Sequence, residues 1–239
     1  EAAEATPASA ETQTVAAPAQ KPVYRFKIGA LDAIALEDGE NPVSNDNKVF
    51  GVGLTPQAVA EPLRAAGQPT DKLLLDIHPL LIRNGARILL FDTGLGQGKG
   101  RLMQSLAAAG VDPAAITDVL ISHGHGDHVG GLVVDGGLAF PQAVIRMSRA
   151  EWASLRAKPA MADLVAVIAP KVQTFEPGSE PVPGVTAQDA AGHTPGHTAY
   201  LIADGQNQLL YTGDLMHHWI VSVEHPDWTV VYDEDEAAG

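Results

Sequence analysis

The feature that most constrains the fold of this chain is a short polar stretch, residues 122–128, which reads Ser-His-Gly-His-Gly-Asp-His. Three histidines and an aspartate fall within six positions, directly after the apolar run 119–121. The intervening glycines give the backbone freedom to curl, so that neighbouring side chains can converge on one point. Histidine and carboxylate are ligands that a metal such as zinc takes at ~2.0–2.2 Å. The stretch therefore predicts a strand that ends in a metal site.

The same stretch separates into two groups of ligands. His123 and His125 lie two positions apart and converge on one ion if the loop curls, whereas Asp127 and His128 emerge on the far side and suit a second ion. The alternative is a solvated polar loop that contains three histidines by chance. The whole chain has only nine histidines in 239 residues, so the metal site is favoured over a chance accumulation of three of them in one loop.

Composition restricts the chemistry further. The chain contains no cysteine, so disulfides, thiolate catalysis and cysteine-bound metals are excluded, and any ion must be held by histidine and carboxylate. The formal net charge of -14 argues against a nucleic-acid partner, because binding to phosphates needs a basic face. No apolar run reaches the ~18 residues that a membrane span requires.

The chain divides into a tail and one domain. Residues 1–22 consist mainly of Ala, Glu, Thr, Pro and Gln, a composition that predicts disorder, and residues 23–239 form the predicted domain. Since the chain starts at Glu1 without a methionine, we expect a protein whose secretory signal has been removed, which would be periplasmic or secreted. The alternative is a cytoplasmic protein with a trimmed, flexible end.

Short strands joined by tight turns alternate with helices along this domain. The clearest turn is Asn-Gly at positions 84 and 85, which predicts a hairpin. Ser148 and Glu151 have the spacing of a capping box that begins a helix. A polar loop is expected before residue 53. Strands are predicted at 24–28, 31–36, 73–83, 86–91, 118–121, 143–147, 172–175, 185–188, 198–203 and 208–212, and helices at 55–66, 102–109, 152–157 and 160–169. The pattern indicates an α/β domain with two sheet layers and helices outside.

Polar residues follow predicted strands in two later stretches. Residues 191–197 read Ala-Gly-His-Thr-Pro-Gly-His, and residues 211–214 read Tyr-Thr-Gly-Asp. Each is weak by itself, because Gly-Asp after a strand is usually a turn and a single histidine is usually a satisfied polar group. Together with residues 122–128 they form a set of three that one fold would gather at one place.

These three stretches resemble the motifs of the metallo-β-lactamase superfamily of hydrolases. Within it, the chain is most similar to the branch that contains methyl parathion hydrolase and the metallo-lactonases that open N-acyl homoserine lactones. The similarity to this branch lies in Asp-His-Val-Gly-Gly-Leu at 127–132, Ala-Phe-Pro at 139–141, Asp-Thr-Gly at 92–94, Gly-Asp-Leu at 213–215 and His-Pro-Asp-Trp at 225–228. The resemblance extends from about residue 24 to the end of the chain. It implies a four-layer αββα sandwich with a two-metal site along its edge.

The resemblance also implies a role for each site residue. The first ion would be held by His123, His125 and His193, the second by Asp127 and His128, and both by a bridging Asp214. Asp92 would accept a hydrogen bond from a ligand histidine and fix its tautomer; the alternative for Asp92 is a turn residue. His197 matches a motif position that is not a ligand, and would lie behind the ligands. His217 stands where lactonases of this type carry a substrate-facing tyrosine; a packing role is the alternative.

One departure from the family pattern concerns the second ion. The family places a final metal-binding histidine beyond the Asp214 region, after another helix and strand, whereas this chain ends at Gly239 after the acidic run 233–236. We therefore expect the C-terminal helix and strand to be missing, and the second ion to keep Asp127, His128 and Asp214. Replacement of the missing ligand by His217, His218 or His225 is the alternative.

The resemblance implies a metal-dependent hydrolase with two divalent ions, zinc first and manganese, iron or cobalt as alternatives. The ions would share a water and lower its pKa towards ~7, so that a bridging hydroxide attacks the substrate. Asp127 and Asp214 are the expected catalytic residues, with Asp127 moving a proton. The expected substrate is a small molecule, a lactone or related ester, then a phosphotriester, with a β-lactam less favoured. A homodimer is possible.

Two other classes of function remain open. One is an iron-dependent oxidoreductase, such as a dioxygenase, on the same fold. The di-iron members carry Glu at the position of His125, which counts against a di-iron enzyme but not against a mononuclear dioxygenase. The other is a non-catalytic metal-binding fragment that lacks the last ligand.

Overall fold

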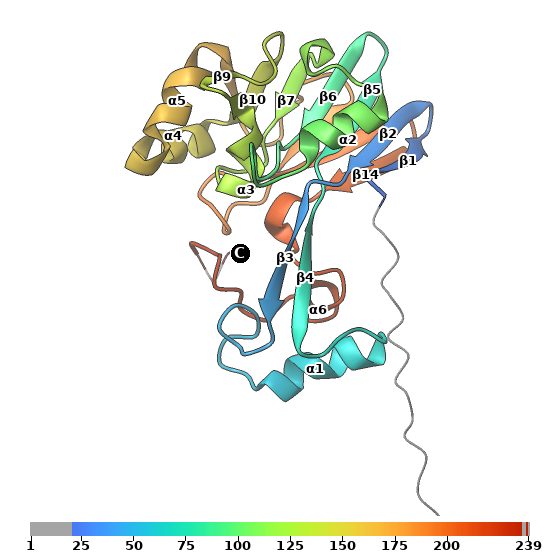
Figure 1. The fold of residues 1–239 in the computed structure, drawn as a ribbon, viewed down its shortest axis with the longest axis vertical. Helices are drawn as coiled ribbons and strands as arrows, with labels where there is room; N and C mark the ends of the chain where they lie inside the picture. Colours follow the sequence, from blue (N-terminus) through green and yellow to red (C-terminus); the bar gives the residue numbers. More distant parts are fainter. Residues whose placement is uncertain (1–20, 236–237, 239) are drawn as a thin grey trace, which may run out of the picture.

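The computed structural model of the chain describes residues 21–235 and residue 238 (Figure 1). Of the tail predicted to be disordered, only Lys21 and Pro22 belong to the described residues, and the rest lies outside them. None of the helices in the described ranges has the length and apolar character that a bilayer crossing requires.

A seven-stranded mixed sheet forms the centre of the molecule. Its strands lie in the order β1-β2-β5-β6-β7-β10-β11 (Figure 1). The half from β1 to β6 is antiparallel, whereas β6, β7, β10 and β11 run parallel to one another. Parallel strands end at the same edge, so the loops that follow β6, β7 and β10 are brought together. The strands are β1 Val23–Ile28, β2 Leu31–Leu36, β5 Leu80–Asn84, β6 Arg87–Phe91, β7 Asp118–Leu120, β10 Val144–Ser148 and β11 Val172–Phe175.

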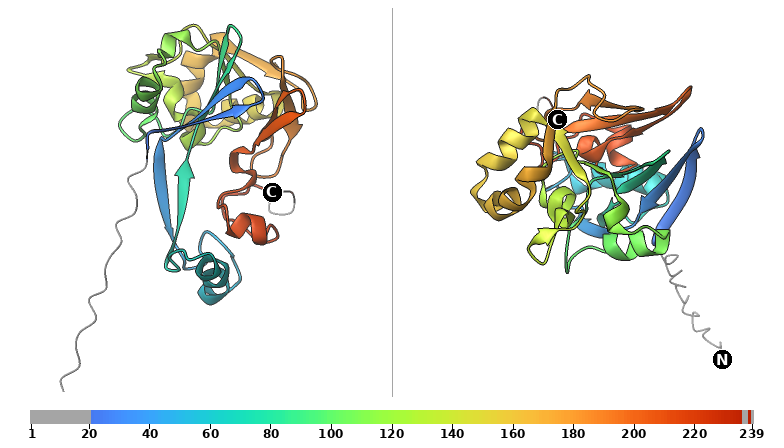
Figure 2. Two further views of the ribbon diagram at one scale, coloured as in Figure 1. Left: turned by 90° about the vertical axis from the view of Figure 1, so that its right-hand side faces the viewer. Right: turned by 90° about the horizontal axis from the view of Figure 1, so that it is seen from above.

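Both faces of the large sheet are covered. Val119 of β7 packs in the core beneath the helices, and its neighbour Leu120 packs in the core between the two sheets. The covering helices are α2 (Leu102–Ala109), α4 (Arg149–Ala157) and α5 (Ala162–Ile168) (Figure 2). The covering sheet is antiparallel and comprises β12 (Val185–Asp189), β13 (Thr198–Asp204) and β14 (Asn207–Tyr211). The predicted α/β class and two-sheet sandwich are confirmed.

A two-stranded arm extends from the sandwich (Figure 1). It consists of β3 (Gly39–Ser44) paired with β4 (Lys72–Ile77), and the helices α1 (Pro56–Ala65) and α6 (Val221–Glu224) pack on it. The arm has an apolar cluster of its own, which we call the arm cluster. Its buried members are Val43, Phe50, Val59, Leu63, Leu73, Ile220, Val221 and Val230.

The arm corrects two sequence predictions. The strand predicted over 73–83 is two strands, since β4 pairs with β3 and β5 joins the large sheet, with His78 and Pro79 between them. Pro79 has no N–H to donate, so the ladder cannot continue through it. The segment before residue 53, predicted as a polar loop, contains β3. Its Glu, Asn and Pro42 are poor strand formers, and the proline is tolerated in a two-stranded ribbon, where each strand has a free edge.

Most local predictions outside the arm are confirmed. Thr55 caps α1 by accepting a hydrogen bond from the Ala58 amide, with Pro56 at the first helical position. The hairpins at residues 84–85 and 204–205 are both present. The helix predicted over 160–169 is shorter, because 3-10 turns flank α5. The remaining short elements are α3 (Gly126–Val129), β8 (Val133–Val134) and β9 (Gly137–Leu138).

Candidate metal centre

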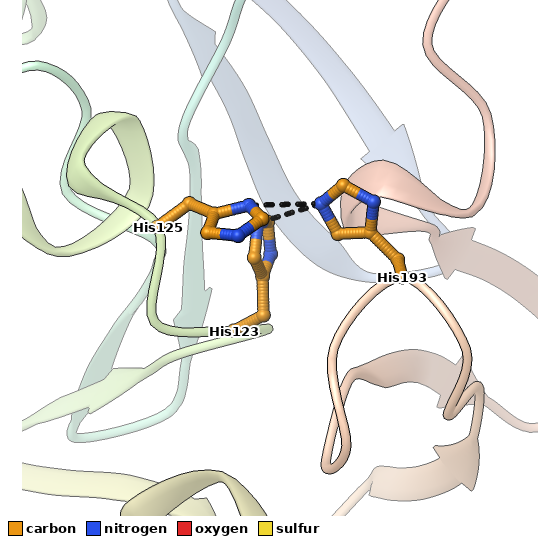
Figure 3. Close-up of side chains that lie close together, drawn as sticks. All are labelled: His123, His125 and His193. Atoms are coloured by element: carbon orange, nitrogen blue, oxygen red, sulfur yellow. Dashed lines mark hydrogen bonds between the residues drawn. The ribbon is translucent and has the colours of Figure 1, made fainter. Parts of the chain in front are cut away.

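Three loops bring the predicted ligands to one place. His123 and His125 lie directly after β7, His193 lies in the loop between β12 and β13, and Asp214 lies in the 3-10 turn after β14. The close-up shows the three imidazole rings facing one another from two of these loops (Figure 3). Stretches that are far apart in the sequence thus meet where the two sheets and the arm approach each other.

The three histidine side chains form a compact cluster. Nε2 of His123 lies 3.0 Å from Nδ1 of His125, and Nε2 of His193 lies 3.2 Å and 3.0 Å from these two atoms (Figure 3). A ring nitrogen that carries a proton cannot accept another, so three mutually adjacent nitrogens cannot all be paired by hydrogen bonds. Three nitrogens bound tetrahedrally at ~2.0–2.1 Å to one ion would be roughly 3.3 Å apart. The cluster therefore fits a ligand set for one cation.

Asp214 lies between this cluster and a second group. Its Oδ1 is 3.1 Å from Nε2 of His128, and its Oδ2 is 3.5 Å from Nε2 of His193 and 3.9 Å from Nε2 of His123. Asp127 has its Oδ2 3.8 Å from the same His128 nitrogen, and its side chain is 40% exposed. One carboxylate thus faces both groups of side chains, which fit a dinuclear site for divalent ions.

Hydrogen bonds behind the ligands fix two histidine tautomers. Nδ1 of His193 donates to Oδ1 of Asp233 at 2.8 Å, and Nδ1 of His128 donates to Oδ2 of Asp92 at 2.8 Å. When either ring is neutral, its Nε2 therefore carries the lone pair, on the side of the ring that faces the site. Such carboxylate–histidine pairs orient a ligand ring and increase its basicity.

Burial and charge set the protonation of the ligand side chains. Burial lowers the pKa of His123 well below its usual range and that of His125 to about 4, which keeps both rings in the neutral form that binds metals. Burial also lowers the pKa of His128, but the carboxylates of Asp214 and Asp92 outweigh it and raise that pKa well above its usual value. Burial raises the pKa of Asp214, but His128 reverses this effect and lowers it well below the usual range. A proton therefore competes with a cation for His128.

His197 supports the bridging residue from behind. Its Nδ1 donates to the carbonyl of Ala190 at 2.9 Å, so Nε2 is an acceptor and takes the backbone N–H of Asp214 at 3.1 Å. Burial lowers the pKa of His197, which favours this neutral form. Gly213 has a φ of 54°, and a Cβ there would lie 2.6 Å from Nε2 of His197. The ring thus faces the turn that carries Asp214 and not the ligand atoms.

The three histidines considered as replacement ligands have different surroundings. His217 is 7% exposed, and its Nε2 lies 3.5 Å from Oδ2 of Asp214 without a hydrogen-bond partner among the described residues. His218 caps α6, since its Nδ1 accepts the amides of two residues of that turn. His225 stacks on Trp228 with the ring centroids 3.8 Å apart. The structure brings only His217 to the site, on the side of the three-histidine cluster.

Sequence reasoning missed several residues that hold the ligands. Asp92 also accepts hydrogen bonds from the Ser122 amide and hydroxyl and from the Tyr211 hydroxyl, which lies 2.9 Å away. The acidic run after residue 232 lies along the His193 loop through residue 235, and two of its amides donate to the carbonyls of His193 and Gly192. Ser122 and Tyr211 are the first residues of the stretches 122–128 and 211–214, and this position is the signal that could have found them.

Glu151 corrects the capping-box prediction in part. Its amide donates to Oγ of Ser148 at 3.0 Å, as a capping box requires. Its carboxylate does not return to the cap residue. It instead accepts hydrogen bonds from the two loops that carry the histidines of the cluster, at Gly124, Thr194 and Gly196.

The site opens into a cavity of about 580 Å³. Asp127, His128, His193, Asp214 and His217 are among the residues that line it. The lining also includes residues of the arm and of the segment after it, as well as Met216 and Tyr232. The arm side is formed by Asn41, Leu75, Asp76, Ile77, His78 and Pro79. The volume is that of a small-molecule site, and apolar and polar groups both face it.

Comparison with known proteins identifies similar sequences and structures. A family model described as the metallo-beta-lactamase superfamily matches residues 75–236, which include every ligand candidate. AidC, a dizinc quorum-quenching lactonase solved with a product, has a TM-score of 0.82 and 28% identity, over 90% of this chain and 82% of that one. The hydrolase AbOPH has a TM-score of 0.79 and 26% identity, over 92% of this chain and 82% of that one.

Two further similarities extend this comparison. A probable metal-dependent hydrolase from Staphylococcus aureus has a TM-score of 0.71 and 26% identity, over 89% of this chain and 82% of that one. Metallo-beta-lactamase domain-containing protein 1 of Mus musculus is 43% identical over 60 residues, which are 25% of this chain and 21% of that protein. The chain thus matches about a fifth of the length of this curated relative.

Proposed function

Because the chain belongs to the metallo-beta-lactamase superfamily, we propose that it is a metal-dependent hydrolase that cleaves a lactone or a related ester. The observation that carries the proposal is the position of Asp214. Its two oxygens face different groups of imidazoles in the lining of one cavity, and this is the arrangement that a pair of ions acting together needs.

The donor set indicates which residues would hold the ions. His123, His125 and His193 would bind the first, Asp127 and His128 the second, and Asp214 both. Imidazole and carboxylate without thiolate suit zinc, with manganese, iron and cobalt as alternatives. When bound, two such ions would polarise the scissile carbonyl and lower the pKa of a water to near neutrality.

Two side chains of the cavity would act on the substrate directly. Asp127 is the most exposed carboxylate of the ligand set, so it can exchange a proton with the attacking or leaving oxygen. His217 directs an unpartnered nitrogen towards the site from the wall beside Met216. We assign His217 to a polar contact with the substrate, since a buried nitrogen without a partner is costly until a ligand satisfies it.

A lactone or ester fits the cavity by its mixed lining. Leu75, Ile77 and Met216 offer apolar contact for an organic substituent, and the candidate ligands His128, His193 and Asp214 belong to the same lining. The lactonase AidC, 28% identical over most of this chain, supports a lactone, and the hydrolase AbOPH supports hydrolysis in general. A phosphotriester remains the second candidate substrate, through the resemblance to methyl parathion hydrolase.

The proposal is tested by metal reconstitution and a substrate panel. The purified chain is stripped of metal and reloaded with zinc, manganese, cobalt or iron(II). It is then assayed on an N-acyl homoserine lactone, an aryl ester, a phosphotriester and a cephalosporin, with oxygen consumption recorded for the iron form. We expect metal uptake and hydrolysis of the lactone or ester. No metal uptake, or oxygen consumption without hydrolysis, would contradict the proposal.

The role of His217 has its own test. His217→Ala should keep both ions and lower kcat/KM by about tenfold, the ~1.4 kcal/mol that one hydrogen bond to the substrate is worth. Metal content measured beside the kinetics separates this from a role as a ligand, because loss of an ion would make His217 a metal ligand instead.

A further inference from the structure

The N-terminus of helix α4 lies against both loops that supply the three-histidine cluster. Ser148 precedes the helix, and its hydroxyl accepts the Glu151 amide while donating to the carbonyl of Gly196 at 2.7 Å. Glu151 is in the first turn of the helix and is 0% exposed. The start of α4 is therefore fixed to the loop that carries His193 before the Glu151 side chain is considered.

The Glu151 carboxylate connects that loop to the other one. Its Oε1 accepts the amide of Gly124 at 2.7 Å, and Gly124 lies between His123 and His125. Its Oε2 accepts the hydroxyl of Thr194 at 2.7 Å and the amide of Gly196 at 3.1 Å. Thr194 directly follows His193. One buried side chain thus bonds residues that are adjacent to all three ligands of the cluster, through the amide of Gly124 and the hydroxyl of Thr194.

The cap of helix α4 does not require this arrangement. The Ser148 hydroxyl already satisfies the Glu151 amide, and a neutral side chain at position 151 would leave that bond intact. Burying a carboxylate is costly unless hydrogen bonds compensate it, and here three donors from two loops do so. The hydrogen bonds of the Glu151 carboxylate therefore hold the two histidine loops and not the start of the helix.

Close packing transmits the position of α4 to the loops. A Cβ at Gly124 would lie 3.0 Å from Oε1 of Glu151, and a Cβ at Gly196 would overlap the Glu151 backbone nitrogen. The second group is held by other contacts. His128 is bonded to Asp92 through its ring and to Thr93 through its carbonyl, and none of these bonds involves Glu151.

We propose that Glu151 is a positioning residue that sets the separation of His123, His125 and His193 and thereby the affinity for the first ion alone. The proposal rests on the metal centre of the proposed function. It adds that Glu151 acts on the first half of that centre and not on the second, where the His128 ring is bonded to Asp92.

The test measures metal affinity and not hydrolysis. In Glu151→Gln one carboxylate oxygen is replaced by an NH₂ group, which is a donor. This NH₂ group must face the amide of either Gly124 or Gly196, which is also a donor, so at least one hydrogen bond is lost. Stepwise cobalt(II) titration of the metal-free chain, followed by the visible spectrum and a competing chelator, should show affinity for the first ion reduced by about 10- to 100-fold. The second ion should change by less than about threefold.

Asp118→Asn is the matched control. Asp118 is also a buried carboxylate of the large-sheet region, 1% exposed, but its partners are Arg87 and Arg146. The Asp118→Asn variant should have a lower thermal midpoint than the unchanged chain and the same affinity for each of the two ions. If Glu151→Gln behaves like Asp118→Asn, with lost stability and unchanged affinities, Glu151 serves the fold only and the proposal is wrong.

Thr194 provides a second, milder variant. Thr194→Val removes one donor to Oε2 with little change of shape, whereas Thr194→Ser retains the hydroxyl. Weakened binding of the first ion in the valine variant and normal binding in the serine variant support the proposal. Equal binding in both overturns it, even if Glu151→Gln does not fold. A wild-type chain that takes up no cobalt, zinc or manganese would instead contradict the proposed function itself.

Discussion

Asp214 is the residue on which both halves of the site depend. Its side chain faces His128 on one side and the three-histidine cluster on the other, and its amide is held by His197. The low pKa of its carboxyl keeps it charged at neutral pH. A residue with these contacts affects the whole site when it changes, and the residues around it affect one half.

Asp214→Ala should therefore lose both ions and activity together. We expect hydrolysis to fall by more than about 100-fold, beyond the loss typical of residues that only support a ligand. Metal content after dialysis and hydrolysis of the preferred substrate are measured on the same sample. Asp204→Asn is the control, since Asp204 bonds the Ala30 amide at a distant hairpin and should keep its metal.

His197→Ala should retain most of the metal. The variant removes the acceptor of the Asp214 amide, so we expect activity reduced by about 10- to 100-fold through misplacement of the bridging carboxylate. His197→Gln, whose amide oxygen can accept the same N–H, should recover part of the lost activity. Complete loss of metal in the alanine variant would show that His197 is itself a ligand.

The sequence predicts a site residue when its signal is local, and misses it when its role depends on a bonding partner far away in the sequence. The ligand candidates sit in three glycine-containing stretches, 122–128, 191–197 and 211–214, which are recognisable as a set. Tyr211 bonds Asp92 across 119 positions, Asp233 bonds His193 across 40, and Glu151 bonds Gly124 across 27. Nothing local marks Asp233 or Glu151 as such a partner, because an acidic residue in a first helical turn or after a loop usually has a simpler role.

Among the elements, the short turn after β7 packs directly against the backbone of the loop after β6. Helix α3 leads into a 3-10 turn whose Gly131 lies against the carbonyl of Thr93, where a Cβ would overlap the oxygen. The Thr93 amide and hydroxyl in turn bond the carbonyl of His128. The backbone of the β6 and β7 loops is thus in direct contact beneath the second group of ligands.

Gly131→Ala should destabilise the chain by about 1–3 kcal/mol, the usual effect of overpacking a filled site. At this length, 1 kcal/mol corresponds to about 2–4 °C in thermal midpoint. Gly126→Ala is the matched control five residues earlier, since nothing lies within 4 Å of its added Cβ. Equal midpoints for both variants, measured by thermal unfolding, would disprove the close contact at Gly131.

Elements with strong local signals were predicted, and those defined by pairing were not. Thr55 and Pro56 mark the start of α1, and Asn84 with Gly85 marks a hairpin, because each signal lies within the element. The division of residues 73–83 into β4 and β5 depends on which strand each half meets. Both halves are apolar, so the pattern does not distinguish the arm from the large sheet.

The molecule as a unit combines a rigid sandwich with a separately packed arm. Ligands come from the loops of both sheets, and the arm supplies a wall of the cavity. If ions bind the folded chain and not the unfolded one, they should stabilise the whole fold.

Removing metal should consequently lower the thermal midpoint. At a free concentration 100 times the dissociation constant, one ion contributes about 2.7 kcal/mol. This corresponds to a shift of about 5–10 °C for a chain of this size. The measurement compares the reconstituted chain before and after a chelator. Asp214→Ala is the control and should show no shift, whereas an equal shift would mean that the chelator acts elsewhere.

The arm cluster has a consequence for how this molecule can change over evolutionary time. Its apolar residues are separate from the two cores of the sandwich, so we expect the arm to open as a unit of its own, with amides that exchange with solvent faster than those of β7. Substitutions at Leu75 or Ile77 would reshape the cavity while leaving the sandwich and its ligands in place. Selection can thus alter which substrates enter independently of the machinery that would cleave them.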